Sequence, residues 1–413
     1  MKQIKTQLLM LLLTFATLNA QECHAPMAEW QNACQILMFT PGSELFDGLI
    51  HPAAGLFEEY FDADAAAMEH RNYIRMLEAN GITVTNIRDV LLQIDIDTLR
   101  EMAYSVLTYD TEGLSKKDAE QYGEAYKRTI IGKMSRQDLS RVLLLQPTVV
   151  LKSVDNNTGI EAVYKHTPVM NLYFTRDQSI NTPRGMVVCQ MNSSQRFPET
   201  RILKMVYAHL GIKPVFEVKG DGRLEGGDYI PAGNEAFIGC GMRTNIQAIK
   251  QMMEADAFGH DTVVVVNDHL LWQMEMHLDT HFGIIDRNLC TMQASRANAR
   301  KGDKEYCTVD VYARQKGTKE YKLIKKNIGF VDYVTSRGYK IIKINRQDEL
   351  HYANNYLTIA PRHIMAVGGQ SEEYQKALKD NGVTVEWMPL ENLIRGYGAA
   401  HCMTQVIERR FQP

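Results

Sequence analysis

Five stretches of the chain show the same change of hydrophobic pattern, from the spacing of about 3.6 residues typical of an amphipathic helix to the continuous apolar run of a buried strand. In every stretch a glycine stands between the two parts, where helices commonly end in a left-handed residue. One such unit is common in any α/β protein, but five of them predict a repeat and hence an α/β architecture of five similar modules. The predicted helices cover 63–78, 203–210, 246–255, 328–336 and 372–379, the glycines are Gly81, Gly211, Gly259, Gly338 and Gly382, and the strands follow at 82–84, 214–216, 263–266, 341–344 and 383–387.

The gap between the first two units is much the longest, and its pattern is helical from about residue 89 to 146. Apolar periodicity predicts helices over 96–108, 116–131 and 136–145, with Asp95 and Ser135 as candidate N-caps. We therefore expect a helical insertion between the first two modules. The alternative is a separate N-terminal domain that ends near residue 150, but this division would isolate the first unit, at 63–87, from the others.

The first twenty residues have the composition of a secretory signal peptide. Lys2 and Lys5 precede an apolar run from Leu8 to Leu18, and the small residue Ala20 follows. The apolar run is too short for a membrane-spanning helix, which needs about 20 residues. We expect a signal peptide at 1–20, a catalytic region at 21–413 and export to the periplasm or the medium. A buried first element in a cytoplasmic protein is the alternative.

Composition narrows the classes of partner. The 413 residues include 46 basic and 49 acidic side chains, for a formal charge of -3, with 45% hydrophobic and 23% charged residues. This is a globular balance without the basic excess that favours nucleic acid or an anionic membrane, so we expect neither as a partner. A small-molecule substrate is the favoured partner, and a homo-oligomer remains open.

The cysteines argue against a zinc framework. They stand at 23, 34, 189, 240, 290, 307 and 402, and no Cys-x-x-Cys pair exists. In an exported chain a disulfide could join Cys23 with Cys34, or Cys290 with Cys307. Because the number of cysteines is odd, one of them has to remain unpaired within the monomer, and we expect this to be Cys402.

Reactive side chains are concentrated in four short stretches, 171–177, 224–228, 276–280 and 398–404. Cys402 is a candidate nucleophile, but a free thiol has a pKa of about 8.5 and needs a cationic neighbour to ionise at neutral pH. His277 or a cationic substrate can supply that charge, and His277 can also protonate a leaving group and then activate water. Glu225 is placed to orient His277 and to favour its charged form.

Two further carboxylates, Asp177 and Asp279, have no evident partner in the sequence. Two acidic groups directed at one pocket suit a guanidinium, because it is planar and offers paired N–H donors. Attack of a thiolate on the guanidinium carbon would give a tetrahedral adduct, loss of ammonia a covalent thiouronium, and hydrolysis a ureido product. Alone, each residue has an ordinary alternative: an Asp can cap a turn, 225–228 can be a tight turn, and His277 and Asp279 can simply share one face of a strand.

The four stretches resemble the signature blocks of the arginine deiminase family, within the guanidino-group-modifying (pentein) superfamily. The segments 41–45, 68–82 and 355–361 also resemble blocks of that family, so the likeness covers about residues 37–408. It implies a five-bladed α/β propeller of pseudo-fivefold modules with a helical insertion after the first. It also implies a cofactor-free hydrolase that converts L-arginine and water to L-citrulline and ammonia.

The resemblance assigns a role to each candidate. It implies that Cys402 is the nucleophile, His277 the general acid and base, and Glu225 its partner carboxylate. Asp177 and Asp279 match the guanidinium-binding pair. The substrate's amino-acid end would be held by Asn171, by Asp228 at the entrance, and by Arg196 and Arg243, the arginines bidentate to the α-carboxylate.

Two positions depart from the family pattern. Tyr397 stands where many members have a gating arginine that can pair with the aspartate matched by Asp228, and the spacing from Glu225 to Arg243 is one residue short. The substrate could therefore be another guanidine, such as a methylated arginine, agmatine or a peptidyl arginine, or the enzyme could be an amidinotransferase. A binding module without activity is the alternative of a different class. A metal site at His277, Asp279 and Cys402 is not expected, because their spacing matches no standard ligand set.

Overall fold

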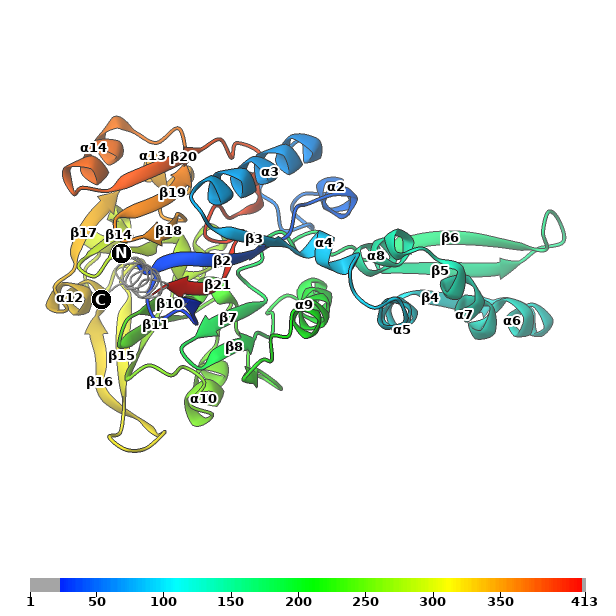
Figure 1. Cartoon of the computed structure of the whole chain (residues 1–413), viewed down its shortest axis with the longest axis horizontal. Coiled ribbons are helices and arrows are strands. Elements are labelled where there is room, and N and C mark those ends of the chain that lie inside the picture. The colour runs from blue at the N-terminus through cyan, green and yellow to red at the C-terminus, as the bar shows by residue number, and fades with distance from the viewer. Residues whose placement is uncertain (1–22, 411–413) are drawn as a thin grey trace, which may run out of the picture.

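The computed structural model describes residues 23–410, and it contains the five predicted units (Figure 1). The predicted signal peptide at 1–20 lies outside the described residues. In each unit two antiparallel strands are followed by a helix and by a third strand that runs parallel to the second. The α/β prediction is therefore confirmed, and the repeat appears as one topology used five times.

The elements of the five units are β21 (Gln405–Arg410), β2 (Asn32–Met38), α3 (Ala63–Ala79) and β3 (Thr83–Asn86); β7 (Ser179–Thr182), β8 (Gly185–Val188), α9 (Phe197–His209) and β9 (Phe216–Glu217); β10 (Tyr229–Ala232), β11 (Glu235–Cys240), α10 (Ile246–Glu254) and β12 (Thr262–Asn267); β13 (Phe282–Asp286), β14 (Leu289–Gln293), α12 (Phe330–Ser336) and β17 (Lys340–Ile344); and β18 (Leu357–Ala360), β19 (His363–Val367), α14 (Glu372–Asp380) and β20 (Thr384–Met388). Short helices α2 (Ser43–Leu49), α11 (Ala294–Asn298) and α13 (Arg346–Leu350) lie between them.

The helices of the five units lie around the outside of the body, with the strands inside (Figure 1). Each helix buries only one side. In α10, for example, Ala248, Ile249 and Met252 are buried at the spacing of a helical face. The predicted glycines follow the helices with positive φ, for example +78° at Gly81 and +71° at Gly259, which allows the chain to turn into the next strand.

The first unit is assembled from both ends of the described chain. Its strand β21 pairs antiparallel with β2, and β1 (Cys23–His24) pairs with the outer side of β21. A disulfide joins Cys23 to Cys34, which was one of the two pairings left open. The other pairing is absent, because Cys290 and Cys307 are both free thiols, as is Cys402.

The insertion projects from the body as an arm, and it is more than helical (Figure 1). It contains α4 (Ile87–Leu91), α5 (Ile96–Val106), α6 (Lys116–Tyr122), α7 (Glu124–Lys133) and α8 (Arg136–Leu145), together with a sheet of β4 (Thr108–Gly113), β5 (Pro147–Ser153) and β6 (Ile160–His166). The prediction missed this sheet, and it placed one helix at 116–131 where Gly123 separates two. Asp95 and Ser135 cap α5 and α8 as predicted.

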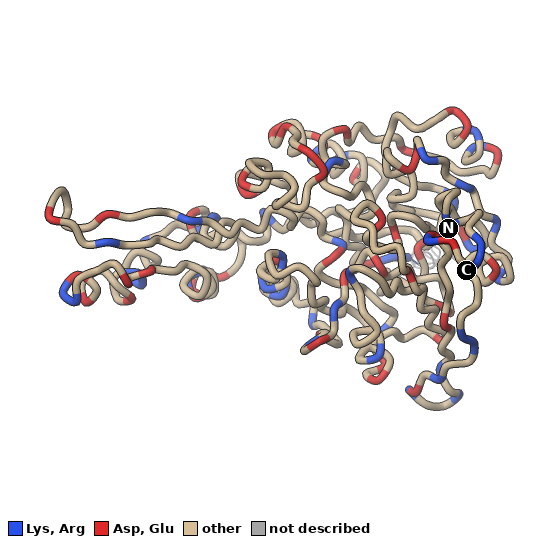
Figure 2. The backbone as a smooth tube through the Cα atoms, turned by 180° about the vertical axis from the view of Figure 1, so that it is seen from behind, with Lys and Arg blue, Asp and Glu red and all other residues tan. Residues whose placement is uncertain are grey.

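A second hairpin, β15 (Thr308–Arg314) and β16 (Tyr321–Gly329), extends the sheet of the third unit, because β15 pairs with β12. Its strands precede α12 in the chain, which is why α12 begins two residues later than the helix predicted at 328–336. Basic and acidic residues are both scattered over the body and the arm (Figure 2). Within residues 23–410 no helix has the length and apolar character needed to cross a membrane.

Candidate active site

The candidate residues occupy equivalent places in the five units. Each unit carries a polar or nucleophilic side chain in the turn that leads into its first strand, so the repeat directs one such group per unit to a common site. These groups are Asp177 before β7, Glu225 before β10, Asp279 before β13, Asn355 before β18 and Cys402 before β21. All five are buried.

The turn that carries Glu225 requires its two glycines. Gly226 and Gly227 begin a 3-10 turn, Gly226–Asp228, just before β10. A Cβ on Gly226 would lie 2.0 Å from the carbonyl oxygen of Arg176, and a Cβ on Gly227 would lie 2.6 Å from His277 Nδ1. The tight turn considered as the ordinary alternative is therefore present, and it is also what allows the imidazole to lie against the backbone beside Glu225.

His277 is held between two carboxylates. Its Nε2 lies 2.9 Å from Glu225 Oε2, and its Nδ1 lies 3.8 Å from Asp177 Oδ1. Burial on its own would lower the pKa of His277, but Asp177 and the hydrogen bond with Glu225 outweigh it and raise that pKa to about 9. Burial likewise opposes ionisation of Glu225, yet His277 and Arg243 lower the pKa of this carboxylate to about 2. An imidazolium–carboxylate pair at neutral pH follows.

The strand expected at His277 and Asp279 is absent. His277 is the extended residue before a 3-10 turn, Leu278–Thr280, and Asp279 lies within that turn. The turn sends the two side chains to different partners. His277 contacts Glu225, whereas Asp279 Oδ2 lies 2.7 Å from His401 Nδ1.

Cys402 lies beside Asp279 and Asn355. Its Sγ is 3.5 Å from Asp279 Oδ2, and it accepts a hydrogen bond of 3.1 Å from Asn355 Nδ2. Asn355 Oδ1 in turn accepts from the backbone N–H groups of Ala399 and Cys402, at 2.9 and 3.2 Å, which fixes the loop that carries the thiol. Burial, followed by the charges of Asp279 and Asp177, raises the pKa of the Cys402 thiol well above its ordinary value. The free protein therefore holds a neutral thiol.

Asp177 and Asp279 share an arrangement that the sequence did not reveal. In each carboxylate Oδ2 has a buried hydrogen-bond partner. For Asp177 this partner is Arg196 Nη1 at 2.8 Å, and for Asp279 it is His401 Nδ1 at 2.7 Å. In each, Oδ1 is buried and accepts no hydrogen bond from any described residue. Two buried acceptors without donors are costly, so they indicate a ligand that brings N–H groups.

A small cavity opens beside these groups. Its lining comprises Leu56, Asn171, Phe174, Asp177, Arg196, Arg243, Gln273, Met276, His277, Gly396, Tyr397 and Cys402. The Cys402 thiol, the His277 imidazole and the Asp177 carboxylate thus line one space together with Asn171, Arg196 and Arg243. Of the residues predicted to hold the substrate's amino-acid end, only Asp228 does not line it. Tyr397, at the position of the family's gating arginine, belongs to the same lining and adopts a left-handed conformation with φ of 67°.

The two arginines of the predicted carboxylate clamp differ in their surroundings. The Arg196 guanidinium is already bound, with Nε 3.1 Å and Nη2 2.9 Å from Glu199 Oε2 and Nη1 on Asp177. Arg243 donates to Gln273 Oε1 at 3.1 Å, and its buried Nε has no hydrogen-bond partner among the described residues. The sequence spacing from Glu225 to Arg243 is one residue shorter than in the family pattern, yet Arg243 Nη1 lies 3.7 Å from Glu225 Oε1. Arg196 therefore holds Asp177, and Arg243 is the arginine with a free donor.

Asp228 is not part of the cavity lining. Its Oδ1 accepts a hydrogen bond of 3.0 Å from the backbone N–H of Leu278, behind His277. Burial raises the pKa of Asp228 to about 6. This place supports the turn of His277 rather than the entrance expected for a substrate-binding residue. Asn171 does line the cavity, and its side chain donates to the carbonyl of Gly55 at 2.9 Å, which ties the loop of Leu56 to the site.

Several functional candidates were missed. Asn355 was noted only as part of a strand-like stretch, and His401, Glu199 and Gln273 were not singled out. The repeat was the available signal for Asn355, since it precedes β18 as Asp279 precedes β13. Three ligand atoms of Asp177, Glu225 and His277 lie within 4.8 Å of one another, as a metal site would need. A metal there would compete with the Glu225–His277 hydrogen bond, and its absence stays a prediction.

Comparison with known proteins agrees with this geometry. The model of the family described as arginine deiminase matches residues 54–409. Arginine deiminase of Halobacterium salinarum is 24% identical and is aligned over 92% of this chain and 96% of its own. DDAH from Pseudomonas aeruginosa, solved with citrulline, has a TM-score of 0.53 at 15% identity, with 92% and 100% of the two chains covered. The N-terminal domain of ArgZ, an arginine dihydrolase of cyanobacteria, has a TM-score of 0.55 at 14% identity, with 90% and 97% covered. Since the family match spans most of the sequence, the chain belongs to the arginine deiminase family.

Proposed function

We propose that this protein hydrolyses L-arginine to L-citrulline and ammonia. The observation that carries the proposal is a pair of buried oxygens without a hydrogen-bond donor among the described residues, Asp177 Oδ1 and Asp279 Oδ1. Their two carboxylates contact His277 and Cys402, respectively. A guanidinium offers N–H groups on both of its edges, so one such group can satisfy both carboxylates while its carbon faces the thiol. No neutral ligand would balance the two negative charges equally well.

Substrate binding also activates the nucleophile in this scheme. Burial, together with the charges of Asp279 and Asp177, keeps the thiol neutral in the free protein. A bound guanidinium neutralises them and adds a positive charge, so the thiol pKa falls and its proton is lost to solvent. The hydrogen bond from Asn355 Nδ2 then stabilises the thiolate.

The first half-reaction forms a carbon–sulfur bond and breaks a carbon–nitrogen bond. Cys402 Sγ adds to the guanidinium carbon and gives a neutral tetrahedral adduct. His277, cationic because of Glu225 and Asp177, donates its proton to the departing nitrogen. Ammonia leaves, and a positively charged S-alkylthiouronium remains on Cys402 while His277 is neutral.

The second half-reaction uses water. Neutral His277 takes a proton from a water molecule, the hydroxide adds to the thiouronium carbon, and collapse of this adduct expels the thiolate. The remaining hydroxyl proton is released, which leaves the ureido group of citrulline. His277 is again an imidazolium, held by Glu225, and the sulfur is ready to be reprotonated when product leaves.

The amino-acid end of the substrate is assigned to the arginine with a free donor. Arg243 lines the cavity and has an unpartnered, buried Nε, which suits an α-carboxylate. Asn171 lies on the same lining. This preference for a free carboxylate favours arginine over agmatine, which lacks one.

Architecture and location extend the proposal. The five equivalent units, with helices outside and site residues in equivalent turns, support a pseudo-fivefold propeller, and a crystal structure without a common fivefold axis would contradict it. Export after removal of 1–20 is supported by the Cys23–Cys34 disulfide, because disulfides persist mainly in oxidising compartments. Fractionation of the native cells, with the mature N-terminus sequenced, tests this part.

The central experiment is a substrate panel with purified protein. Arginine, methylated arginines, agmatine and a peptidyl arginine are supplied separately, with ammonia and ureido product measured. We expect arginine to give the highest kcat/KM, whereas product from another guanidine alone, or transfer to an amine, would replace the assignment. Cys402→Ala should remove turnover and keep the fold, and a quenched wild-type reaction should show the mass of the thiouronium on Cys402. Turnover by Cys402→Ala would exclude the covalent route.

A further inference from the structure

A row of buried ionisable side chains runs from the active site to the N-terminal segment, residues 23–34. Asp279 Oδ2 lies 2.7 Å from His401 Nδ1, and His401 Nε2 lies 3.6 Å from Glu29 Oε1. Glu29 Oε2 accepts a hydrogen bond of 2.8 Å from Arg409 Nη2. Each of the four residues is at most 5% exposed. The reaction proposed above uses only the first of them, so the other three need an explanation.

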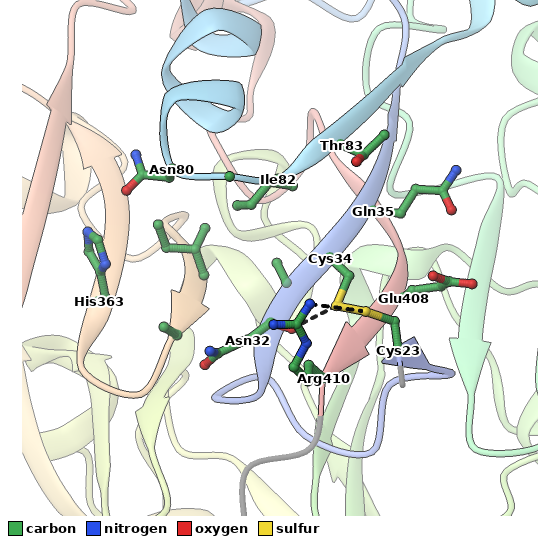
Figure 3. A pocket seen from close by; sticks show the side chains of 14 residues that line it. Cys23, Asn32, Cys34, Gln35, Asn80, Ile82, Thr83, His363, Glu408 and Arg410 are labelled. Carbon is green, nitrogen blue, oxygen red and sulfur yellow. Dashed lines mark hydrogen bonds between the residues drawn. A yellow bond between two sulfur atoms is a disulfide. The ribbon is translucent and has the colours of Figure 1, made fainter. Parts of the chain in front are cut away.

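Glu29 reaches this position because its segment is fastened at several points. The disulfide ties Cys23 to Cys34 on β2, at the wall of a pocket near Arg410 (Figure 3). Further along, the backbone N–H of Glu29 donates to Pro231 O at 3.0 Å, and the carbonyl of Met27 accepts from Gly233 N–H at 2.8 Å. The segment thus bridges the first and third units, and it holds Glu29 in the interior between them.

The segment lies outside the part of the chain that matches the family model. That match begins at residue 54, whereas Glu29 and both cysteines of the disulfide precede it. Two small cavities meet at Glu29. One is shared with Asp279 and His401, and the other with Arg176 and Arg409. Because this interior is not fully packed, hydrogen bonds and ion pairs, rather than close packing alone, have to fix the carboxylates.

We propose that Glu29 and His401 are positioning residues for Asp279, and that the Cys23–Cys34 disulfide fastens the segment that presents Glu29. His401 occupies Asp279 Oδ2, whereas Oδ1 has no hydrogen-bond donor among the described residues and is available to a ligand. Glu29 fixes the far side of the imidazole, and Arg409 fixes Glu29. The role of Asp279 toward a guanidinium rests on the proposed function, but its effect on the Cys402 thiol does not.

The test is a double-mutant cycle between Glu29 and His401. His401→Asn keeps an N–H donor for Asp279 but removes the link to Glu29, whereas His401→Leu removes both. We expect Glu29→Gln to lower kcat/KM for arginine about 10-fold, and His401→Leu about 100-fold, the range known for small misplacements of a reacting group. In the His401→Asn background Glu29→Gln should cost nothing further. An equal loss in both backgrounds would mean that Glu29 acts only through Arg409 and the fold, and would overturn the proposal.

Glu235→Gln is the matched control, since Glu235 is also a buried carboxylate paired with an arginine, Arg337. It should lower the melting temperature as Glu29→Gln does while leaving kcat/KM unchanged. A loss of kcat/KM in this control equal to that in Glu29→Gln would refute a specific role.

Thiol titration separates this inference from the proposed function. The apparent pKa of Cys402 is measured by the pH dependence of its alkylation with iodoacetamide, which requires no turnover. A displaced Asp279 no longer raises the thiol pKa, so Glu29→Gln should shift the alkylation curve to lower pH, but not in the His401→Asn background. This shift would persist even if arginine proved not to be the substrate. An unchanged curve in Glu29→Gln would overturn the inference.

The disulfide is tested by the double variant Cys23→Ser/Cys34→Ser, assayed in the full chain. We expect a measurable loss of kcat/KM that does not exceed that of Glu29→Gln, and no additional loss when the two changes are combined. Wild-type kcat/KM in the disulfide-free variant would overturn its part in fastening Glu29.

Discussion

The charge of Asp279 should have opposite effects on the reactivity of the free thiol and on turnover. In Asp279→Asn the side chain keeps its shape and an oxygen for His401, but the negative charge 3.5 Å from Cys402 Sγ is lost. A negative charge opposes formation of a thiolate, so its removal lowers the thiol pKa. The free variant should therefore be alkylated faster than the wild type at neutral pH.

The size of this effect follows from the distance. Two unit charges 3.5 Å apart at an effective dielectric constant of about 20 interact by roughly 5 kcal/mol, which corresponds to about 3 pK units. This is a ceiling, because the hydrogen bond with His401 already stabilises the Asp279 carboxylate and Asp177 retains its charge. A fall of the Cys402 pKa by about 1 to 3 units is the expected range. Turnover should nevertheless drop by about 100- to 1000-fold, since a guanidinium loses one of its charge-assisted hydrogen bonds and its alignment.

Two assays on the same protein measure the two effects. The rate of alkylation by iodoacetamide is followed against pH, with the Cys402→Ala protein subtracted to remove the contribution of the other free thiols. Ammonia release from arginine gives kcat and KM. Glu235→Gln serves as a control for loss of a buried carboxylate and should change neither quantity.

The result that refutes the reasoning is a thiol pKa in Asp279→Asn equal to or above that of the wild type. The aspartate would then not act on the sulfur through its charge. Turnover close to the wild-type value would refute the second half, namely that Asp279 binds the guanidinium.

Three further changes test other parts of the site. Arg243→Gln should raise KM for arginine about tenfold and leave KM for agmatine almost unchanged. Arg196→Gln should impair turnover of both substrates, because Arg196 holds Asp177. Parallel kinetics with the two substrates distinguish these outcomes. The pKa of His277 is raised from 6.5 to about 9 in the folded state, so its charged form stabilises the fold by up to about 3 kcal/mol. This contribution to the free energy of unfolding should be complete below pH 6.5 and disappear as the pH rises through 9. Denaturant titrations of the wild type and of His277→Asn should therefore converge at high pH. Gly227→Ala places a Cβ 2.6 Å from His277 Nδ1 and should reduce kcat at least tenfold with little change in the circular dichroism spectrum, while unaltered kcat would show that the imidazole has room to move.

The repeat could be predicted because its signals are local. A helix that ends at a left-handed glycine and continues as an apolar strand needs only neighbouring residues, and the caps Asp95 and Ser135 mark helix starts in the same way. The sheet of the arm left no such signal. Strand β6 is exposed along most of its length, so its residues show neither a buried run nor clear alternation. Its pairing with β5 is specified by tertiary context.

Within the site, residue types could be predicted better than their contacts. Cys402, His277, Glu225 and the two aspartates were identified from their chemistry and from the family likeness. That Arg196 is bound by Glu199 depends on how α9 begins, and that Asp228 supports Leu278 depends on the turn before β13. The strand expected at His277 was wrong because a 3-10 turn and an alternating strand place the same two residues in different directions. Asn355 was passed over because an amide has no distinctive chemistry until its neighbours are known.

The pairing of β21 with β2 has a consequence for biosynthesis. A polypeptide leaves the ribosome amino end first, so β2 emerges early in synthesis. Its pairing strand β21 is available only when nearly the whole sequence has been translated. Cys402 immediately precedes that late strand, whereas Asp177, Glu225 and Asp279 emerge well before it. Nascent chains and prematurely terminated products therefore lack Cys402, the proposed nucleophile. Closing so long a loop is also entropically slow, and under the proposed export this delay would give an export apparatus time to engage an unfolded precursor.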